Sequence, residues 1–260
     1  MPSLNTSKTQ LRATGKAGAA LAWTALLLGL VCVATVLLAA LGYRSGGLGL
    51  GTTIQAIRWG TIGALAGVVL AVLALVIAKP AGARRKFLLV AAAALVLNAL
   101  VAAPPLYLVA QAKKLPLIHD ITTDTHNPPH FVAVVPLRSG ATNPVDYDPA
   151  NAAEQQRGYP DIAPLVLANI PPAQSFARAE RAARALGWSI VSAAPQEGRL
   201  EATDSTPLLG FKDDIVVRIR ADGTGQGSVV DVRSASRVGL SDIGTNAKRI
   251  RAFLRALQTH

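Results

Sequence analysis

Three long runs without a charged side chain occupy the first part of the chain and restrict its fold more than any other feature. They cover residues 17–43, 59–78 and 87–112 and consist mostly of Ala, Leu, Val and Gly. A bilayer core about 30 Å thick needs roughly 20 helical residues, and only a helix or a closed barrel satisfies its backbone hydrogen bonds in lipid. The runs therefore predict three transmembrane helices, with spans at about residues 18–42, 59–78 and 87–110.

The charges around these runs predict their direction. All 15 acidic residues lie at or after Asp120, so only Lys and Arg flank the runs. The tail and the second connection hold Lys8, Arg12, Lys16, Lys79, Arg84, Arg85 and Lys86, whereas the first connection holds Arg44 and Arg58. Basic flanks stay in the cytoplasm. We therefore expect a bacterial inner-membrane protein with a cytoplasmic tail (1–16), a transmembrane region (17–112) and a periplasmic domain (113–260), although Lys113 and Lys114 reduce the asymmetry.

The first run has an alternative interpretation as a cleaved signal peptide. A basic tail precedes it, and small residues occur at Ala39 and Ala40. The apolar part of a signal peptide is about 7–15 residues long, so this run is too long. We therefore expect a retained span.

Few polar residues occur inside the spans. Asn98 is the strongly polar residue deep in the third span, and no span centre holds an ionisable side chain, which argues against ion or proton transport. Gly63 and Gly67 form a pair that lets a neighbouring helix approach closely, within the chain or in an assembly. Pro104 and Pro105 predict a kink or an end of the third helix.

Most of the excess positive charge of the chain lies outside the outer domain. The formal net charge of +11 comes mostly from the membrane flanks, so it does not predict nucleic-acid binding. Residues 119–170 are rich in Pro, Asn and Asp, which predicts an extended, mostly irregular lead segment that wraps over the core.

The remainder of the domain predicts a helix, four strands and a second helix. The helix begins at Pro171-Pro172 and ends at Gly187, the strands cover 188–193, 199–206, 214–220 and 228–236, and the last helix follows Ser241 as N-cap. Alternation places Ile215, Val217, Ile219, Val230 and Val232 on one face. The predicted fold class is α+β: three transmembrane helices, then a two-layer domain with an antiparallel sheet and two helices on one face.

The opposite face of this sheet is polar. It carries Asp214, Arg218, Arg220, Asp231, Arg233 and Arg237, and Glu201 and Thr203 are able to join it. One interpretation is a set of cross-strand ion pairs on a solvated surface. The other is a binding surface, because the guanidiniums outnumber their local carboxylates and Arg suits carboxylate or phosphate ligands.

A long irregular motif spans the last strand and the last helix. It reads VDVRSASRVGLSDIGTNAKRIR at Val230–Arg251, with GFKDD at Gly210–Asp214. Over roughly residues 118–258 the chain resembles the domain-of-unknown-function family numbered 1499, and it is similar to membrane-bound members with N-terminal spans. The resemblance implies no reaction and no cofactor. With the polar face, the motif gives these candidate ligand-binding residues: Arg218, Asp231, Arg233, Ser234, Ser236, Arg237, Asp242, Asn246, Asp213 and Asp214.

Catalytic and metal sites have weak support in the sequence. His119, Asp120, Asp124, His126 and His130 lie close together but match no recognised metal-ligand spacing, and GxSxG is absent. We therefore assign no catalytic residue, metal or cofactor.

Three functions remain open. We prefer a non-catalytic envelope module in contact with membrane lipid, which binds an anionic ligand or a partner protein through the Arg-rich sheet face. The first alternative is a periplasmic enzyme that uses Asp213, Asp214 or Asp242 as acid or base. The second is a structural subunit of a membrane complex, assembled through Gly63 and Gly67. The oligomeric state stays open.

Overall fold

The computed structural model describes residues 3–78 and 85–258, with the backbone alone for residues 3–15 and 78. The chain divides into two compact units, Met1–Ala110 and Gln111–His260, and each is described by itself. The connection expected at residues 79–84 and the first two residues of the expected tail lie outside the described residues.

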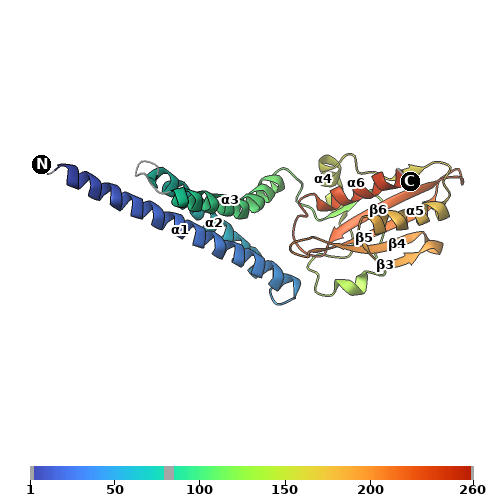
Figure 1. Cartoon of the computed structure of the whole chain (residues 1–260). Coiled ribbons are helices and arrows are strands. Elements are labelled where there is room, and N and C mark those ends of the chain that lie inside the picture. The colour runs from blue at the N-terminus through green and yellow to red at the C-terminus, as the bar shows by residue number, and fades with distance from the viewer. Residues whose placement is uncertain (1–2, 79–84, 259–260) are drawn as a thin grey trace. The chain divides into compact units, whose positions relative to one another are not determined.

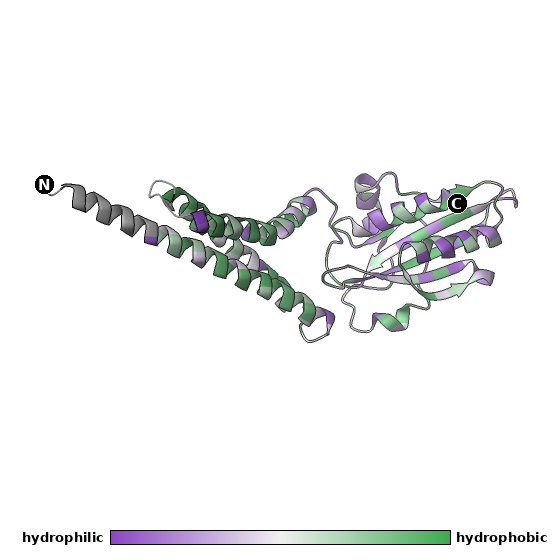
Figure 2. Cartoon of the chain, viewed as in Figure 1, coloured by the Kyte–Doolittle hydropathy of each residue, from purple (hydrophilic) through white to green (hydrophobic). Residues whose placement is uncertain are grey.

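Three long helices form the first unit: α1 (Ser3–Arg44), α2 (Leu50–Ala78) and α3 (Arg85–Ala112) (Figure 1). Each is long and apolar enough to cross a membrane. Figure 2 shows hydrophobic residues along the described side chains of all three, as expected for helices with lipid around them. The predicted class of three long apolar N-terminal helices is confirmed. Helix α1 starts at Ser3, so residues 3–16 of the expected tail are helical.

Small side chains make the contacts between these helices. Three layers each take one buried residue from every helix: Ala22, Ala74 and Ala91, then Ala25, Ala71 and Ala94, then Cys32, Ala64 and Ala102. Lipid tails are as apolar as Leu, so burial alone does not hold such helices together. Close approach of backbones over small residues supplies the packing contacts instead.

Asn98 links all three helices. Its side-chain Nδ2 donates hydrogen bonds to the carbonyl oxygens of Ala25 in α1 (2.9 Å) and Ala94 in α3 (2.8 Å), and the residue is fully buried. Its Oδ1 has no N–H or O–H partner and faces Gly67 of α2. Asn98 thus has a structural position inside the unit.

Both glycines of the pair in α2 face other helices of the same chain. A Cβ at residue 63 would lie 2.8 Å from Cys32 Sγ, and a Cβ at residue 67 would overlap the Asn98 amide. Since only a hydrogen fits at these positions, the pair serves packing within the chain.

The two prolines of α3 do not end the helix, which continues to Ala112 with Pro104 and Pro105 inside it. Figure 1 shows that the last part of α3 is bent relative to its first part. A bend is the expected effect of a ring that clashes with the preceding turn.

The second unit is built on one antiparallel sheet (Figure 1). Its strands are β1 (Asp120–Thr122), β2 (Leu165–Leu167), β3 (Ser189–Ala194), β4 (Arg199–Ser205), β5 (Lys212–Ala221) and β6 (Ser228–Ser236). Their order is β1-β6-β5-β4-β3, and β2 also pairs with β6. The four predicted strands are confirmed within two residues at each end. The sequence did not reveal β1 and β2, because three residues are too few to show alternation.

Helices α5 (Pro172–Ala185) and α6 (Thr245–Gln258) pack on one face of the sheet. The predicted face of Ile215, Val217 and Ile219 lies in this core, with Val230 and Val232 beside it. Trp188 and Phe253 stack there with ring centroids 4.9 Å apart. The predicted α+β class, an antiparallel sheet with helices, is confirmed.

The start of α6 differs from the prediction. Ser241 is not its N-cap, because Ile243 (φ 51°) and Gly244 (φ 75°) have left-handed backbones and the helix begins at Thr245. Asp242 accepts hydrogen bonds from the backbone amides of Gly244 (3.0 Å) and Asn246 (2.6 Å) instead. The Ser241 hydroxyl accepts from the Ile243 amide ahead of the helix (3.2 Å), so the Asp242 carboxylate satisfies the free amides at the helix start.

The lead segment is less irregular than expected. It contains two 3-10 turns, η1 (Val135–Arg138) and η2 (Pro149–Asn151), and the short helix α4 (Ala152–Gly158). Gln155 in α4 holds β1, because its side chain exchanges hydrogen bonds with the Thr122 backbone at 3.0 and 2.7 Å. The segment is thus tied to the edge of the sheet.

We predict that Gly67→Leu destabilises the first unit by about 1–3 kcal/mol, the usual effect of overpacking a close contact. The new side chain must displace the Asn98 amide, which two hydrogen bonds hold in place. Thermal unfolding of the detergent-purified protein measures this. Gly51→Leu is the control, because a Cβ at residue 51 meets nothing within 4 Å. Equal melting of the two variants would contradict the packing role of Gly67.

Candidate functional site

The sheet face opposite α5 and α6 is covered, not solvated. Phe131 and Val134 of the lead segment pack there against Val216 and Ala235. The charged side chains of this face are buried beneath the segment: Glu201, Asp214, Asp231 and Arg233 are all 0% exposed. The expectation of a solvated surface is wrong for these residues. A buried charge is stable only when it is paired and hydrogen-bonded, so the partners decide what this face does.

Arg233 lies at the centre of the covered face. Its guanidinium binds the Asp120 carboxylate through Nη2 (2.6 Å) and Nε (3.0 Å). It also donates to the backbone carbonyls of Val145 (2.7 Å) and Pro129 (3.3 Å). The Phe131 ring centroid lies 4.7 Å from Arg233 Cζ, in the range of a cation–π contact. All three guanidinium nitrogens therefore bond within the fold.

Asp214 joins two arginines. Arg138 Nη1 lies 2.7 Å from Asp214 Oδ2, and Arg237 reaches both oxygens, with Nε at 2.9 Å and Nη2 at 2.7 Å. Thr203 donates its hydroxyl to Oδ1 at 2.8 Å. Arg237 also binds the carbonyl of Leu137 at 2.6 Å, so it fixes turn η1 to the sheet.

A third cluster surrounds Asp231, whose Oδ2 accepts from Arg218 (2.9 Å) and from Arg220 (3.2 Å). Arg218 also binds Asp124 (3.3 Å) and the carbonyl of Asn127 (2.9 Å). Arg220 keeps half of its side chain exposed. Of the three clusters on this face, this one reaches solvent most.

Glu201 binds the covering segment through backbone amides. Its carboxylate accepts from the N–H groups of Val132, Ala133 and Val134, each at 3.0 Å, and it also pairs with Arg199. Charge-assisted bonds of this kind are about twice as strong as neutral ones. Glu201 therefore anchors the segment that hides the arginines.

The rest of the candidate site lies on the other face of the sheet, toward α6. Asn246 Oδ1 accepts from the Ser234 hydroxyl (2.6 Å), and Asn246 Nδ2 donates to Ser236 Oγ (3.0 Å). Arg249 bonds to Asn246 (2.6 Å), to Ser234 (3.1 Å) and to Asp213 (2.8 Å). These buried side chains join α6 to β5 and β6.

The structure therefore separates the candidate residues into two groups. Asp214, Arg218, Asp231, Arg233 and Arg237 lie on the covered face, whereas Asp213, Ser234, Ser236 and Asn246 lie on the face toward α6, with Asp242 at its end. Sequence reasoning did not assign Arg138 and Arg249 to the site. Their carboxylate partners, Asp214 for Arg138 and Asp213 for Arg249, lie far away in the chain, so no local pattern indicates that these arginines are buried.

Two ionisable groups near the start of α6 have shifted pKa values. Burial raises the pKa of Asp242, and the amides of Asn246 and Gly244 oppose that shift. Burial, and secondarily the Asp242 carboxylate, raises the pKa of Tyr159 to about 12. The Tyr159 hydroxyl is buried without a hydrogen-bond partner. Burial is therefore the main cause of both shifts.

The histidine-rich stretch is dispersed. His126 and His130 are exposed, and His119 lies half-buried at the start of β1. Across residues 3–78 and 85–258, no group of three His, Cys, Asp or Glu side chains is placed to hold a metal ion.

The fold and the bonded motif define a class: an antiparallel α+β domain that follows three apolar helices. The family model described as "Protein of unknown function (DUF1499)" matches residues 120–257, and the chain belongs to this family. The resemblance to this family seen in the sequence is thereby confirmed, while the likeness to its membrane-bound members stays a prediction. A search of curated proteins returned no match.

We predict that Arg233→Ala lowers the free energy of unfolding of the domain by about 3–5 kcal/mol, because it leaves the Asp120 charge buried without its partner. Urea unfolding in detergent, followed by Trp188 fluorescence, measures this. Trp23 and Trp59 are replaced by Phe in every variant, so that Trp188 alone reports. Arg220→Ala is the control and lowers the free energy of unfolding by less than about 1 kcal/mol. The Arg220 side chain is half-exposed, and Arg218 still pairs with Asp231 in this variant. An unchanged urea midpoint for Arg233→Ala would refute the buried pair.

Tyr159 gives a prediction for alkaline pH. Its folded pKa of about 12 lies above the ordinary value of 10.0, so the folded protein keeps a proton that the unfolded chain releases. The corresponding stability is present below pH 10 and is lost as the pH rises toward 12. Tyr159→Phe removes this loss, and the same urea experiment at pH 8 and pH 11 measures it. Tyr107→Phe is the control, and parallel curves for both variants would exclude the shift.

Proposed function

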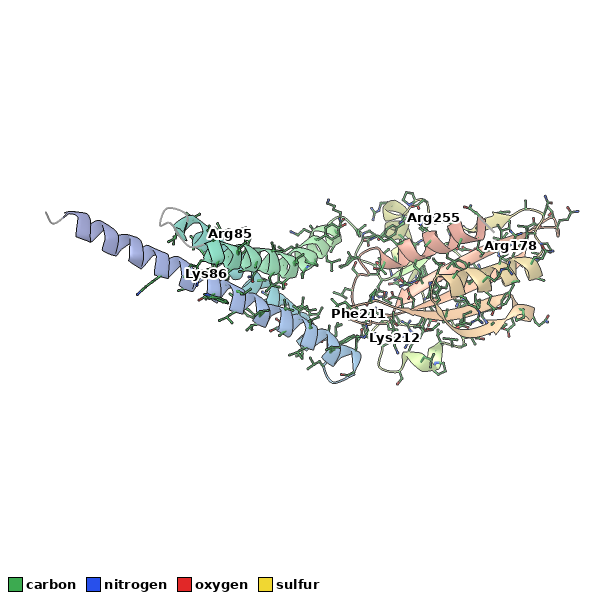
Figure 3. The ribbon with its side chains drawn as sticks, in the orientation of Figure 1. Arg85, Lys86, Arg178, Phe211, Lys212 and Arg255 are labelled. Atoms are coloured by element: carbon green, nitrogen blue, oxygen red, sulfur yellow. The ribbon has the colours of Figure 1, made fainter. Side chains whose placement is uncertain are left out.

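We propose that this chain is a multi-pass protein of the bacterial inner membrane, with its N-terminus in the cytoplasm and residues 113–260 in the periplasm. The basic residues that flank the apolar helices support this direction, since Lys and Arg are retained on the cytoplasmic side. Arg85 and Lys86 lie side by side at the start of α3 (Figure 3), and the first connection carries fewer such charges.

We further propose that the outer domain is a non-catalytic module. A carboxylate that acts as a general acid or base must lie within reach of its substrate. Asp214 is bonded to two arginines, Asp213 to Arg249, and Asp242 to two backbone amides. A substrate would have to break bonds that hold the domain together.

In this proposal, the same contacts argue against the arginines as the binding surface. An anionic ligand at Arg233 or Arg237 would have to displace Asp120 or Asp214, and both carboxylates belong to the fold. The arginines are therefore not a surplus of positive charge. The single observation that carries the proposal is this internal pairing, and it leaves the exterior of the domain as the surface that contacts a partner.

A structural-subunit role based on the glycine pair has less support. Gly63 and Gly67 already face Cys32 and Asn98 of the same chain. Assembly through α2 would need another face of that helix.

Reporter fusions test the location. A reporter that is active only after export, fused after His260, is expected to be active, and a reporter that fluoresces only in the cytosol is expected to be dark. The positive flanks predict this because they hold the N-terminus inside. Truncated fusions at residues 45–49 and 79–84 are matched controls, expected to be exported and cytosolic respectively.

The opposite pattern after His260 would overturn the location. A different result would contradict the proposal that the outer domain is non-catalytic. If Asp242→Asn folded normally and lost the cellular phenotype while Asp242→Glu kept it, a chemical role for the carboxylate would replace the proposal.

A further inference from the structure

One end of the outer domain carries three leucines whose side chains are exposed and lie outside the hydrophobic core. Leu240 is 76% exposed, Leu117 is 67% exposed and Leu208 is 54% exposed. They lie in three different segments: the stretch before β1, the turn between β4 and β5, and the turn between β6 and α6. Singly exposed leucines are ordinary, so their common location decides whether they matter.

Backbone and side-chain contacts bring the three segments to the same end. The amide of Arg237 donates to the carbonyl of Lys212 (3.0 Å), which joins the turn after β6 to the start of β5. The amide of Asp242 donates to the carbonyl of Ile118 (3.3 Å), which joins that turn to the stretch before β1. Figure 3 labels Phe211 and Lys212 at this end of the sheet.

Exposed lysines accompany the leucines. Lys113, Lys114 and Lys212 all reach solvent. Asp204 and Asp213 of the same end both pair with Arg249, and Asp242 binds backbone amides. Glu154 lies beside Leu117 and accepts a hydrogen bond from its backbone amide (3.1 Å). This end therefore presents apolar side chains and positive charge together, the combination that binds an anionic lipid surface.

The covalent link between α3 and the outer domain indicates which surface this end contacts. Lys113 and Lys114 directly follow Ala112, the last residue of α3, which is long and apolar enough to cross a membrane. A chain extends at most about 3.5 Å per residue, so residues 115–118 are held close to the lipid headgroups at the end of that helix. Because the domain is tethered to α3, the headgroup layer is present near residues 115–118 at a high effective concentration.

We propose that this end, made of Leu117, Leu208, Leu240, Lys113, Lys114 and Lys212, docks onto the anionic headgroup layer of the bilayer that holds the helices. The leucines enter the headgroup boundary and the lysines bind lipid phosphates. The docking rests on the proposed membrane embedding of α1 to α3, but it does not depend on which side of the membrane the domain occupies.

The test uses the full-length protein in lipid nanodiscs. Cys32, the one cysteine of the chain, is replaced by Ala, and a single cysteine is placed at residue 208 or 240 for an environment-sensitive fluorophore. Residue 166 is the matched control, because Val166 is 59% exposed but pairs with the other end of β6. With phosphatidylglycerol present, the labels at 208 and 240 are expected to be shielded from a water-soluble quencher, and the label at 166 is not.

Amide hydrogen exchange of the unlabelled protein gives a second measurement. Exchange in residues 206–211 and 237–244 is expected to be slower in anionic than in neutral nanodiscs. Lys212→Glu is expected to lower the docked-to-undocked ratio by about fivefold or more, because one basic residue near an anionic surface contributes roughly that factor. Arg255→Glu is the matched control, since Arg255 is exposed in the last turn of α6, at the helix end away from residues 237–244.

Equal quenching at 208, 240 and 166 in both lipids would overturn the docking. Shielding that appears in native membranes but not in nanodiscs would also overturn it and assign this end to a partner protein. The reporter fusions decide the location independently, so a failure of docking and a failure of the proposed location are distinguishable.

Discussion

Everything on the polar side of the sheet depends on the requirement that buried charges be paired. Arg233 and Asp214 carry no exposed surface, and each is stable there only because Asp120, Arg138 and Arg237 reach it from the lead segment or from the sheet. The lead segment is therefore held by the charges that it covers. Glu201 completes the arrangement, because its carboxylate binds three consecutive amides of that segment.

The need to pair buried polar groups also shapes the helical unit at residues 1–110. A polar side chain among apolar helices needs hydrogen bonds within the protein, and Asn98 Nδ2 donates to carbonyl oxygens of α1 and α3. Gly67 leaves the space that the Asn98 amide occupies. Both units thus use a few satisfied polar groups to fix how their elements pack.

This pairing changes the meaning of the family motif. Ser234, Asn246 and Arg249 form one bonded group under α6, while Arg233 and Arg237 bind carboxylates on the other face. The motif side chains therefore stabilise the fold through these bonds. In the docking that we propose, the exposed leucines and lysines at one end of the domain are the part of its surface that contacts the bilayer.

The sequence by itself determined the three apolar helices, the four long strands and the helix-facing residues such as Ile215 and Val217, because span length and two-residue alternation are local signals. It also located the motif that marks the family. Only the tertiary structure decided that the polar face of the sheet is covered by the lead segment. The pairing of Asp120 with Arg233 and of Arg138 with Asp214 joins residues far apart in the chain, and no local pattern records such a partner. Burial of the arginines is therefore a property of the fold.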